Sequence, residues 1–362
     1  MCSLNYRLLS LIGSLFIGLS FVVAVSPAAA AVPDIWAFAY NDTLTFSPGW
    51  WAINPAYQTG SFKITCSGST AMINQLSTGR YAVFFPCSAS SNGIVHVTAV
   101  NEAARYCEIE RWYDSGTDKM VIVQCFKGSF ADNSRFTVTY TRSSGTVAGK
   151  VHAYVWSAPG GVPLSNYNSA GPANTITHLG VGRWEVKIPM SSDGSFKGDL
   201  QATAVQESDI ACRCHIDNWY ISGFDNRVRV SCTNAAGTLI DTYFTLSYHA
   251  ERAVFGELPS SLSGAAYRTN LPGAPAGTIF GSGGPPTFAP IPPGRYMMHY
   301  PGVGIGATHM QVTAFGGPYG YYCQLETIWM ISGGNVDARV ICFNNVGIPT
   351  DNLLFSSFAY HR

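Results

Sequence analysis

Cysteine is the residue type whose spacing most clearly suggests covalent chemistry in this sequence. Three units of two alternating runs each begin and end with a cysteine: Cys107 and Cys125, Cys214 and Cys232, Cys323 and Cys342. The runs have the period of strands and a glycine separates them, so each unit predicts a β-hairpin. Cross-strand cysteines in a hairpin are close enough for a disulfide. We therefore expect the bonds Cys107–Cys125, Cys214–Cys232 and Cys323–Cys342.

The remaining cysteines leave one side chain unpaired. Cys66 and Cys87 both precede the first hairpin and have no equivalents elsewhere, so we expect a fourth bond between them. Cys212 is then the odd cysteine, and three fates are open: competition with Cys214, a buried thiol, or a bond to another chain that would make an oligomer. Zinc would need wider ligand spacing than this stretch offers and a second ligand pair. We expect neither a metal nor a cofactor.

Histidines and acidic residues form no recognisable catalytic motif. His96 aligns with Gln201 and Gln311 in the other units, so its position does not demand an imidazole. His215 likewise has Glu108 and Gln324 as counterparts. We expect a protein that is not an enzyme.

Two charged positions do recur in all three units. An acidic residue precedes each last strand (Asp132, Asp241, Asp351), and its simplest role is to cap a turn rather than to bind calcium. An arginine follows a glycine at the entrance of another strand (Arg80, Arg183, Arg295). We expect each arginine to pair with the recurring aspartate, with anion binding as the alternative.

Aromatic residues are the better candidates for recognition. Trp50 and Trp51 occur only in the first unit, next to Pro48 and Gly49, which predicts a loop. Together with Tyr57 they are our candidate binding residues, because exposed aromatic rings bind sugars or other proteins. The recurring tryptophans instead predict buried packing positions: Trp112, Trp219 and Trp329.

The units are part of a longer repeat that defines the domains. Corresponding landmarks recur roughly every 110 residues, which gives copy 1 (32–147), copy 2 (148–250) and copy 3 (251–362). Each copy holds about seven short strands, so we expect an all-β fold of three tandem antiparallel β-sandwich-like repeats, with a six-bladed propeller as the alternative. We expect residues 258–293, rich in Pro and Gly, to be an exposed insertion. The copies should pack compactly about a pseudo-threefold axis rather than as a row of beads.

The first 31 residues predict a signal peptide. An apolar run is followed by small residues that suit a cleavage site, although an uncleaved anchor is the alternative. We therefore expect secretion, and no membrane association after cleavage. The net charge is +0 and only 12% of residues are charged, which argues against nucleic acid as a partner.

The order of the repeat motifs also carries a resemblance. The series Gly-x-aromatic, Val-Thr-Ala, Cys-x-Ile and Val-x-Val-x-Cys resembles a tandem repeat of secreted bacterial β-domain proteins of uncharacterised function. Its course is also similar to the small β domains at the tips of phage tail fibres, where three copies associate. The resemblance implies a fold more than a function. We expect an extracellular module that binds a glycan or a protein; a structural or assembly protein of the cell surface, or an enzyme with an unrecognised site, are the alternatives.

Overall fold

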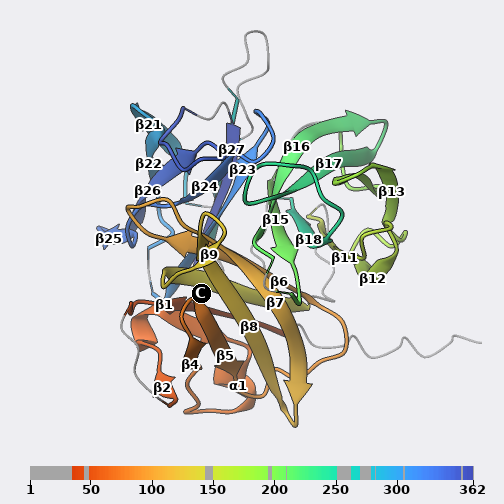
Figure 1. Ribbon diagram of the computed structural model, residues 1–362. Helices are drawn as coiled ribbons and strands as arrows, with labels where there is room; N and C mark the ends of the chain where they lie inside the picture. Colours follow the sequence, from red (N-terminus) through yellow and green to blue (C-terminus); the bar gives the residue numbers. More distant parts are fainter. Residues whose placement is uncertain are drawn as a thin grey trace, which may run out of the picture. The chain divides into compact units, whose positions relative to one another are not determined.

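The computed structural model describes most of the chain after the expected signal peptide. The described residues are 35–44, 49–142, 150–194, 198–208, 210–250, 262–269, 279–281, 283–304, 306–351 and 354–361. Within them the regular secondary structure is all strand, apart from one short helix, α1 (Phe62–Thr65), and one 3-10 turn, η1 (Pro55–Tyr57). The expected all-β fold is confirmed (Figure 1). The expected signal peptide, residues 1–31, lies outside the described residues.

Copy 1 forms two groups of antiparallel strands. One group, in sheet order, is β3 (Gln58–Gly60), β1 (Ile35–Asn41), β10 (Arg135–Arg142) and β6 (Ile94–Val100). The other is β7 (Tyr106–Ser115), β8 (Asp118–Lys127), β5 (Arg80–Phe85), β4 (Met72–Ser77) and β2 (Trp51–Ala52), with β9 (Phe130–Ala131) paired to β8. Buried side chains from both groups share one core, as in a sandwich.

Copy 2 repeats this arrangement. Its first group is β12 (Pro163–Asn168), β11 (His152–Ser157), β18 (Tyr243–His249) and β15 (Asp199–Val205). Its second group is β13 (Thr175–Gly180), β14 (Arg183–Ile188), β17 (Asp225–Asn234) and β16 (Cys212–Ser222).

Copy 3 has the same two groups. The first is β20 (Ile279–Gly281), β19 (Leu262–Thr269), β27 (Leu354–His361) and β23 (Thr308–Phe315). The second is β21 (Thr287–Ile291), β22 (Arg295–Tyr300), β26 (Asn335–Phe343) and β24 (Tyr322–Leu325), with β25 (Met330–Ser332) paired to β26.

The segment 258–293 differs from its expected role as an insertion. The structure places three strands in this range: β19, β20 and β21. Strand β19 pairs along its whole length with β27, just as β1 pairs with β10. This stretch therefore supplies the first strand of copy 3, and its Pro and Gly content concealed the strand period.

Each sheet is shared by two copies. Short parallel bridges join β15 to β7, β16 to β23 and β24 to β6. They merge the six groups into three sheets of nine, ten and eight strands. A six-bladed propeller would need six separate sheets, so the described strands do not form one. Because the third bridge returns from copy 3 to copy 1, the connections close in a cycle rather than forming a row of beads.

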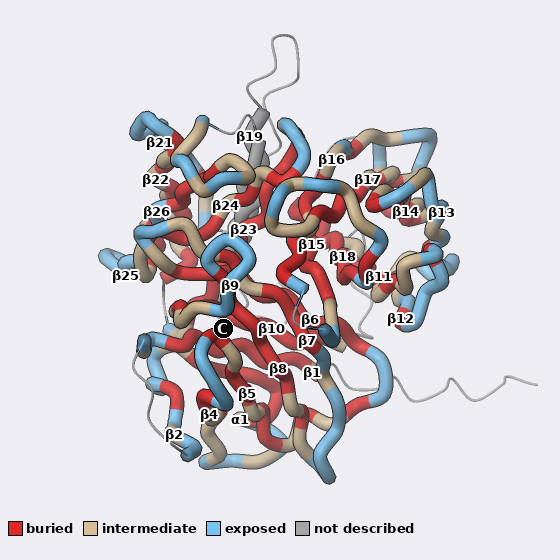
Figure 2. The backbone as a smooth tube through the Cα atoms, in the orientation of Figure 1, coloured by how far each residue is buried: buried red, intermediate tan, exposed pale blue. Residues whose placement is uncertain are grey.

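The cores follow the same cycle. Val205 of copy 2 belongs to the core of copy 1, Phe315 of copy 3 to that of copy 2, and Val100 of copy 1 to that of copy 3. Each of these residues ends a strand at a bridge between copies. The strands β6, β15 and β23 are buried along their whole length (Figure 2). No copy encloses its core with its own residues alone.

Candidate functional site

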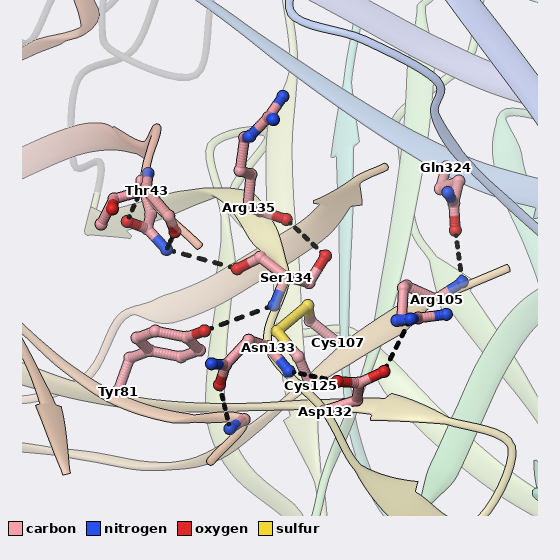
Figure 3. Close-up of a disulfide and its surroundings, with 12 residues drawn as sticks. Thr43, Tyr81, Arg105, Cys107, Cys125, Asp132, Asn133, Ser134, Arg135 and Gln324 are labelled. Atoms are coloured by element: carbon pink, nitrogen blue, oxygen red, sulfur yellow. Dashed lines mark hydrogen bonds and ion pairs between the residues drawn. A yellow bond between two sulfur atoms is a disulfide. The ribbon is translucent and has the colours of Figure 1, made fainter. Parts of the chain in front are cut away.

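The four expected disulfides are present. In the three hairpins the paired cysteines face each other directly across the ladder, with Cα atoms 4.0 to 4.1 Å apart: Cys107–Cys125, Cys214–Cys232 and Cys323–Cys342. The fourth bond joins Cys66 and Cys87, whose Cα atoms are 6.1 Å apart. The first hairpin bond is shown with its surroundings in Figure 3.

Cys212 is a buried thiol. Its side chain is enclosed, its amide donates to Glu108 Oε2 at 2.8 Å, and its Sγ donates to the Ile210 carbonyl at 3.2 Å. Burial, and then the charge of Glu108, raise the pKa of the thiol to about 12. In this conformation Cys214 is bonded to Cys232, and the Cys212 side chain is enclosed.

The recurring arginines pair with different acidic residues than we expect from the sequence. Arg80 makes a bidentate ion pair with Glu110, with distances of 2.5 and 2.7 Å, and Arg295 contacts Glu326 at 2.6 Å. In copy 2 the equivalent separation, from Arg183 to Asp217, is 3.8 Å. Register shifts mark bulges beside Glu110 and Asp217. A bulge re-aims a side chain, and simple alternation does not reveal it.

Two of the three recurring aspartates, Asp241 and Asp351, have the capping role that the sequence indicates, whereas the prediction is wrong for Asp132. Asp241 accepts the amide of Gly182 at 2.7 Å, and Asp351 accepts that of Gly294 at 2.6 Å. In copy 1 the cap is one residue later: Asn133 accepts the amide of Gly79 at 2.8 Å. Asp132 instead forms an ion pair with Arg105 at 2.6 Å (Figure 3).

The three candidate binding residues do not meet in one place. Trp50 is 43% exposed and contacts Phe84 edge-on, whereas Trp51 packs against the core of copy 1. Tyr57 packs against the core of copy 3, where it contacts Trp329. Of these three rings, the one that is largely exposed to solvent is Trp50.

The recurring tryptophans lie in packing positions. Trp219 and Trp329 are buried, and their indole N–H groups donate to Asn226 and Thr308, respectively. Trp112 is half-buried and contacts Trp156 of copy 2, with ring centroids 4.5 Å apart. Trp219 and Trp329 are therefore core residues, and Trp112 joins two copies.

Where the copies meet, threonines connect them in a cycle. Thr98 of copy 1 donates to Gln311 of copy 3 at 2.7 Å, and Thr313 of copy 3 donates to Gln201 of copy 2 at 2.8 Å. The cycle closes where Thr203 of copy 2 lies 3.0 Å from His96 Nδ1 of copy 1. Each threonine also lies within 3.5 Å of a backbone amide of the same neighbouring copy. The three contacts are equivalent, which shows the pseudo-threefold relation directly.

A small cavity of about 50 Å³ adjoins this cycle. Its lining takes equivalent residues from the three copies, including the threonines and one cysteine of each hairpin. One set of equivalents is not uniform: copies 1 and 3 contribute Tyr106 and Tyr322, but copy 2 contributes Arg213. The pseudo-threefold relation is broken at this point.

Arg213 is held between the two tyrosines. Its guanidinium carbon lies 4.7 Å from the ring centroid of Tyr106 and 4.5 Å from that of Tyr322. The residue is only 5% exposed. Burial lowers the pKa of Arg213 and raises that of both tyrosines. Two cation–π contacts, each worth about 2 kcal/mol when desolvated, offset part of the cost of burying the charge.

A second, larger pocket also has Arg213 in its lining. It measures about 430 Å³, and its walls are the loop 102–105 and residues 127–128 of copy 1 together with residues 343, 345–347 and 349 of copy 3. Arg213 and Tyr322 also line it. All three copies thus contribute to one open pocket with a buried cation in its lining.

Comparisons with models of protein families, with curated proteins and with solved structures give no match for this chain.

The buried histidines near the copy boundaries are neutral. Burial lowers the pKa of His96 to about 3 and that of His309 well below its usual value. Burial and the positive charge of Arg213 lower the pKa of His215 to about 4. These values are far below those of an imidazole that exchanges protons near neutral pH.

Sequence reasoning did not identify Arg213 as a site residue. The signal was available in the alignment of the copies, because the residue before the hairpin cysteine is tyrosine, arginine and tyrosine in turn. What the alignment does not show is that these three positions converge between the copies.

Proposed function

We propose that this protein is a secreted, non-enzymatic binding protein that recognises an extracellular glycan. The observation that carries the proposal is the 430 Å³ pocket built by loops of copies 1 and 3 around Arg213 of copy 2. Its volume lies within the range of small-ligand sites, which combine a largely preformed cavity with a few polar groups. A pocket of this kind suits a sugar unit better than the flat surface of a protein partner.

Exposed apolar side chains on the loop 345–349 and on strand β9, which follows the lining residues 127–128, support a binding role. Phe130 is 78% exposed, Val346 71% and Ile348 58%. Val346 lines the pocket itself. Apolar groups beside a polar pocket provide contacts for the C–H faces of a sugar.

Secretion is part of the same proposal. Four disulfides are typical of proteins from oxidising compartments. None of the helices in the described part of the chain has the length and apolar character that a membrane span requires.

Binding of the mature, disulfide-bonded protein to an array of extracellular glycans tests the proposed function. We expect binding to a defined group of glycans, and a Val346→Asp variant should lose it while a Leu164→Asp variant, altered on strand β12, should keep it. No glycan binding by the wild-type protein, or equal binding by both variants, would contradict the proposal.

A further inference from the structure

We propose that the 430 Å³ pocket is a carboxylate site, and that Arg213 is the cation that binds the carboxylate of an acidic sugar. This inference rests on the proposed function and specifies the ligand class. Arg213 is almost completely buried, so its charge has little contact with water.

The hydrogen-bonding capacity of Arg213 is only partly used. Its Nη2 donates to the carbonyls of Ala235 at 2.9 Å and Asn234 at 3.4 Å. Its Nε is buried and has no hydrogen-bond partner. Within the described ranges, no carboxylate forms an ion pair with Arg213; the nearby Glu108 accepts the amide of Cys212. A buried charge normally requires such a partner.

The fold itself does not require an arginine at this position. Tyr106 and Tyr322 occupy the equivalent positions in the other copies and pack there with little exposure. Each of them stacks on a phenylalanine of its own copy, Phe126 or Phe343. An uncharged ring would therefore fill the position of Arg213 without the desolvation cost of a cation, so the charge points to a ligand.

The other charges around the pocket leave a positive balance. Its lining contains Arg105, Lys127, Arg213 and one acidic residue, Glu102. Arg105 is already paired with Asp132 at 2.6 Å. Counting these five side chains, there are three cations and two carboxylates, and the guanidinium of Arg213 is the buried one.

A carboxylate matches this environment best. Guanidinium and carboxylate form short, charge-assisted bonds in a fixed planar geometry, and the two tyrosines already hold the guanidinium in place. The pocket lining also includes the apolar residues Ala103, Val346 and Pro349. A hexuronic acid presents a carboxylate together with C–H groups and fits a pocket of this volume.

Calorimetric titration of the mature protein tests the inference with four probes: glucuronate, glucose, inorganic phosphate and an oligosaccharide that ends in glucuronic acid. We expect glucuronate to bind and glucose to bind at least tenfold more weakly. Phosphate binding as tight as that of glucuronate would overturn the preference for a carboxylate. Tighter binding of the oligosaccharide would identify a glycan end rather than a free acid as the source.

Two variants test the role of the pocket. Arg213→Tyr copies the other two units and should reduce glucuronate affinity at least tenfold, while Arg111→Gln, an exposed arginine outside the pocket, should leave it unchanged. Ala103→Glu places an anion on the exposed rim and should also weaken binding, which keeps the test valid if Arg213→Tyr does not fold. Unchanged affinity in Ala103→Glu or in a folded Arg213→Tyr would overturn the site. Glycan-array binding that survives in Arg213→Tyr but is lost in Val346→Asp would refute the carboxylate site and leave the proposed function standing.

Discussion

The hydroxyl of Thr203 in copy 2 lies 3.0 Å from Nδ1 of His96 in copy 1. Gln201 and Gln311 accept the same kind of contact at the two equivalent positions. A histidine and two glutamines thus have the same structural role, which is to contact a threonine hydroxyl of the neighbouring copy. The difference between them is that histidine can take up a proton.

His96 should make folding sensitive to acid. Burial lowers its pKa to about 3 in the folded protein, whereas an unfolded histidine titrates near about 6.5. The unfolded chain therefore binds the proton first, and stability present above about pH 6.5 falls by about 1.4 kcal/mol per pH unit below it. Between pH 7 and pH 4.5 the free energy of unfolding should therefore fall by ~2–3 kcal/mol less in a His96→Gln variant than in the wild-type protein. Urea unfolding at both pH values measures this, and equal losses in variant and wild type would refute it.

The arginine pairs should differ in strength between copies. The Glu110 side chain is nearly buried and bidentate with Arg80, whereas Asp217 is more exposed and 3.8 Å from Arg183. We expect Glu110→Gln to lower the free energy of unfolding by ~1–3 kcal/mol and Asp217→Asn by less than ~0.5 kcal/mol. Denaturant titration of both variants gives the comparison, and the reverse order would contradict it.

Loss of Trp219 should destabilise the fold far more than loss of Trp50. Trp219 is 4% exposed and bonded to Asn226, whereas Trp50 is 43% exposed. Trp219→Ala should cost ~3–5 kcal/mol, and Trp50→Ala should cost less than ~1 kcal/mol. Thermal unfolding of the two variants measures the difference; similar midpoints would mean that Trp219 is not a core residue.

Cys212 should be chemically silent in the native protein. Its thiol is enclosed and its pKa is raised to about 12. A reagent therefore does not reach the sulfur, and the reactive thiolate is not formed near neutral pH. A thiol reagent should modify no group in the folded mature protein and one group per chain in denaturant. A Cys212→Ala variant should show none in either state. Rapid labelling without denaturant, or reductant-sensitive dimers, would refute this prediction.

The compact arrangement of the three copies should give a small radius of gyration in solution. Residues 32–362 form one compact unit, and a compact chain of this length has a radius of gyration near ~20 Å. Small-angle scattering of the mature monomer should give about this value. A much larger value would indicate separate copies.

Sequence alone determined the all-β class, the three hairpins and the disulfides. Alternation with period two, glycine at the hairpin turns and cysteines at matching offsets are local properties, and the three hairpin bonds follow from them. The caps at Asp241 and Asp351 were predictable, because a cap acts on residues that are close in the fold of one copy; in copy 1 the neighbouring Asn133 caps instead of the predicted Asp132. Strand β19 was missed because Pro and Gly surround it and its period is weak.

Tertiary structure alone decided which residues of different copies meet. The bulges beside Glu110 and Asp217 moved the arginine pairs away from the predicted aspartates. The position of Arg213 between Tyr106 and Tyr322 depends on three bridges between strands that are far apart in the chain. No local period encodes such convergence, because it arises from the way each copy completes its core with a residue of the next.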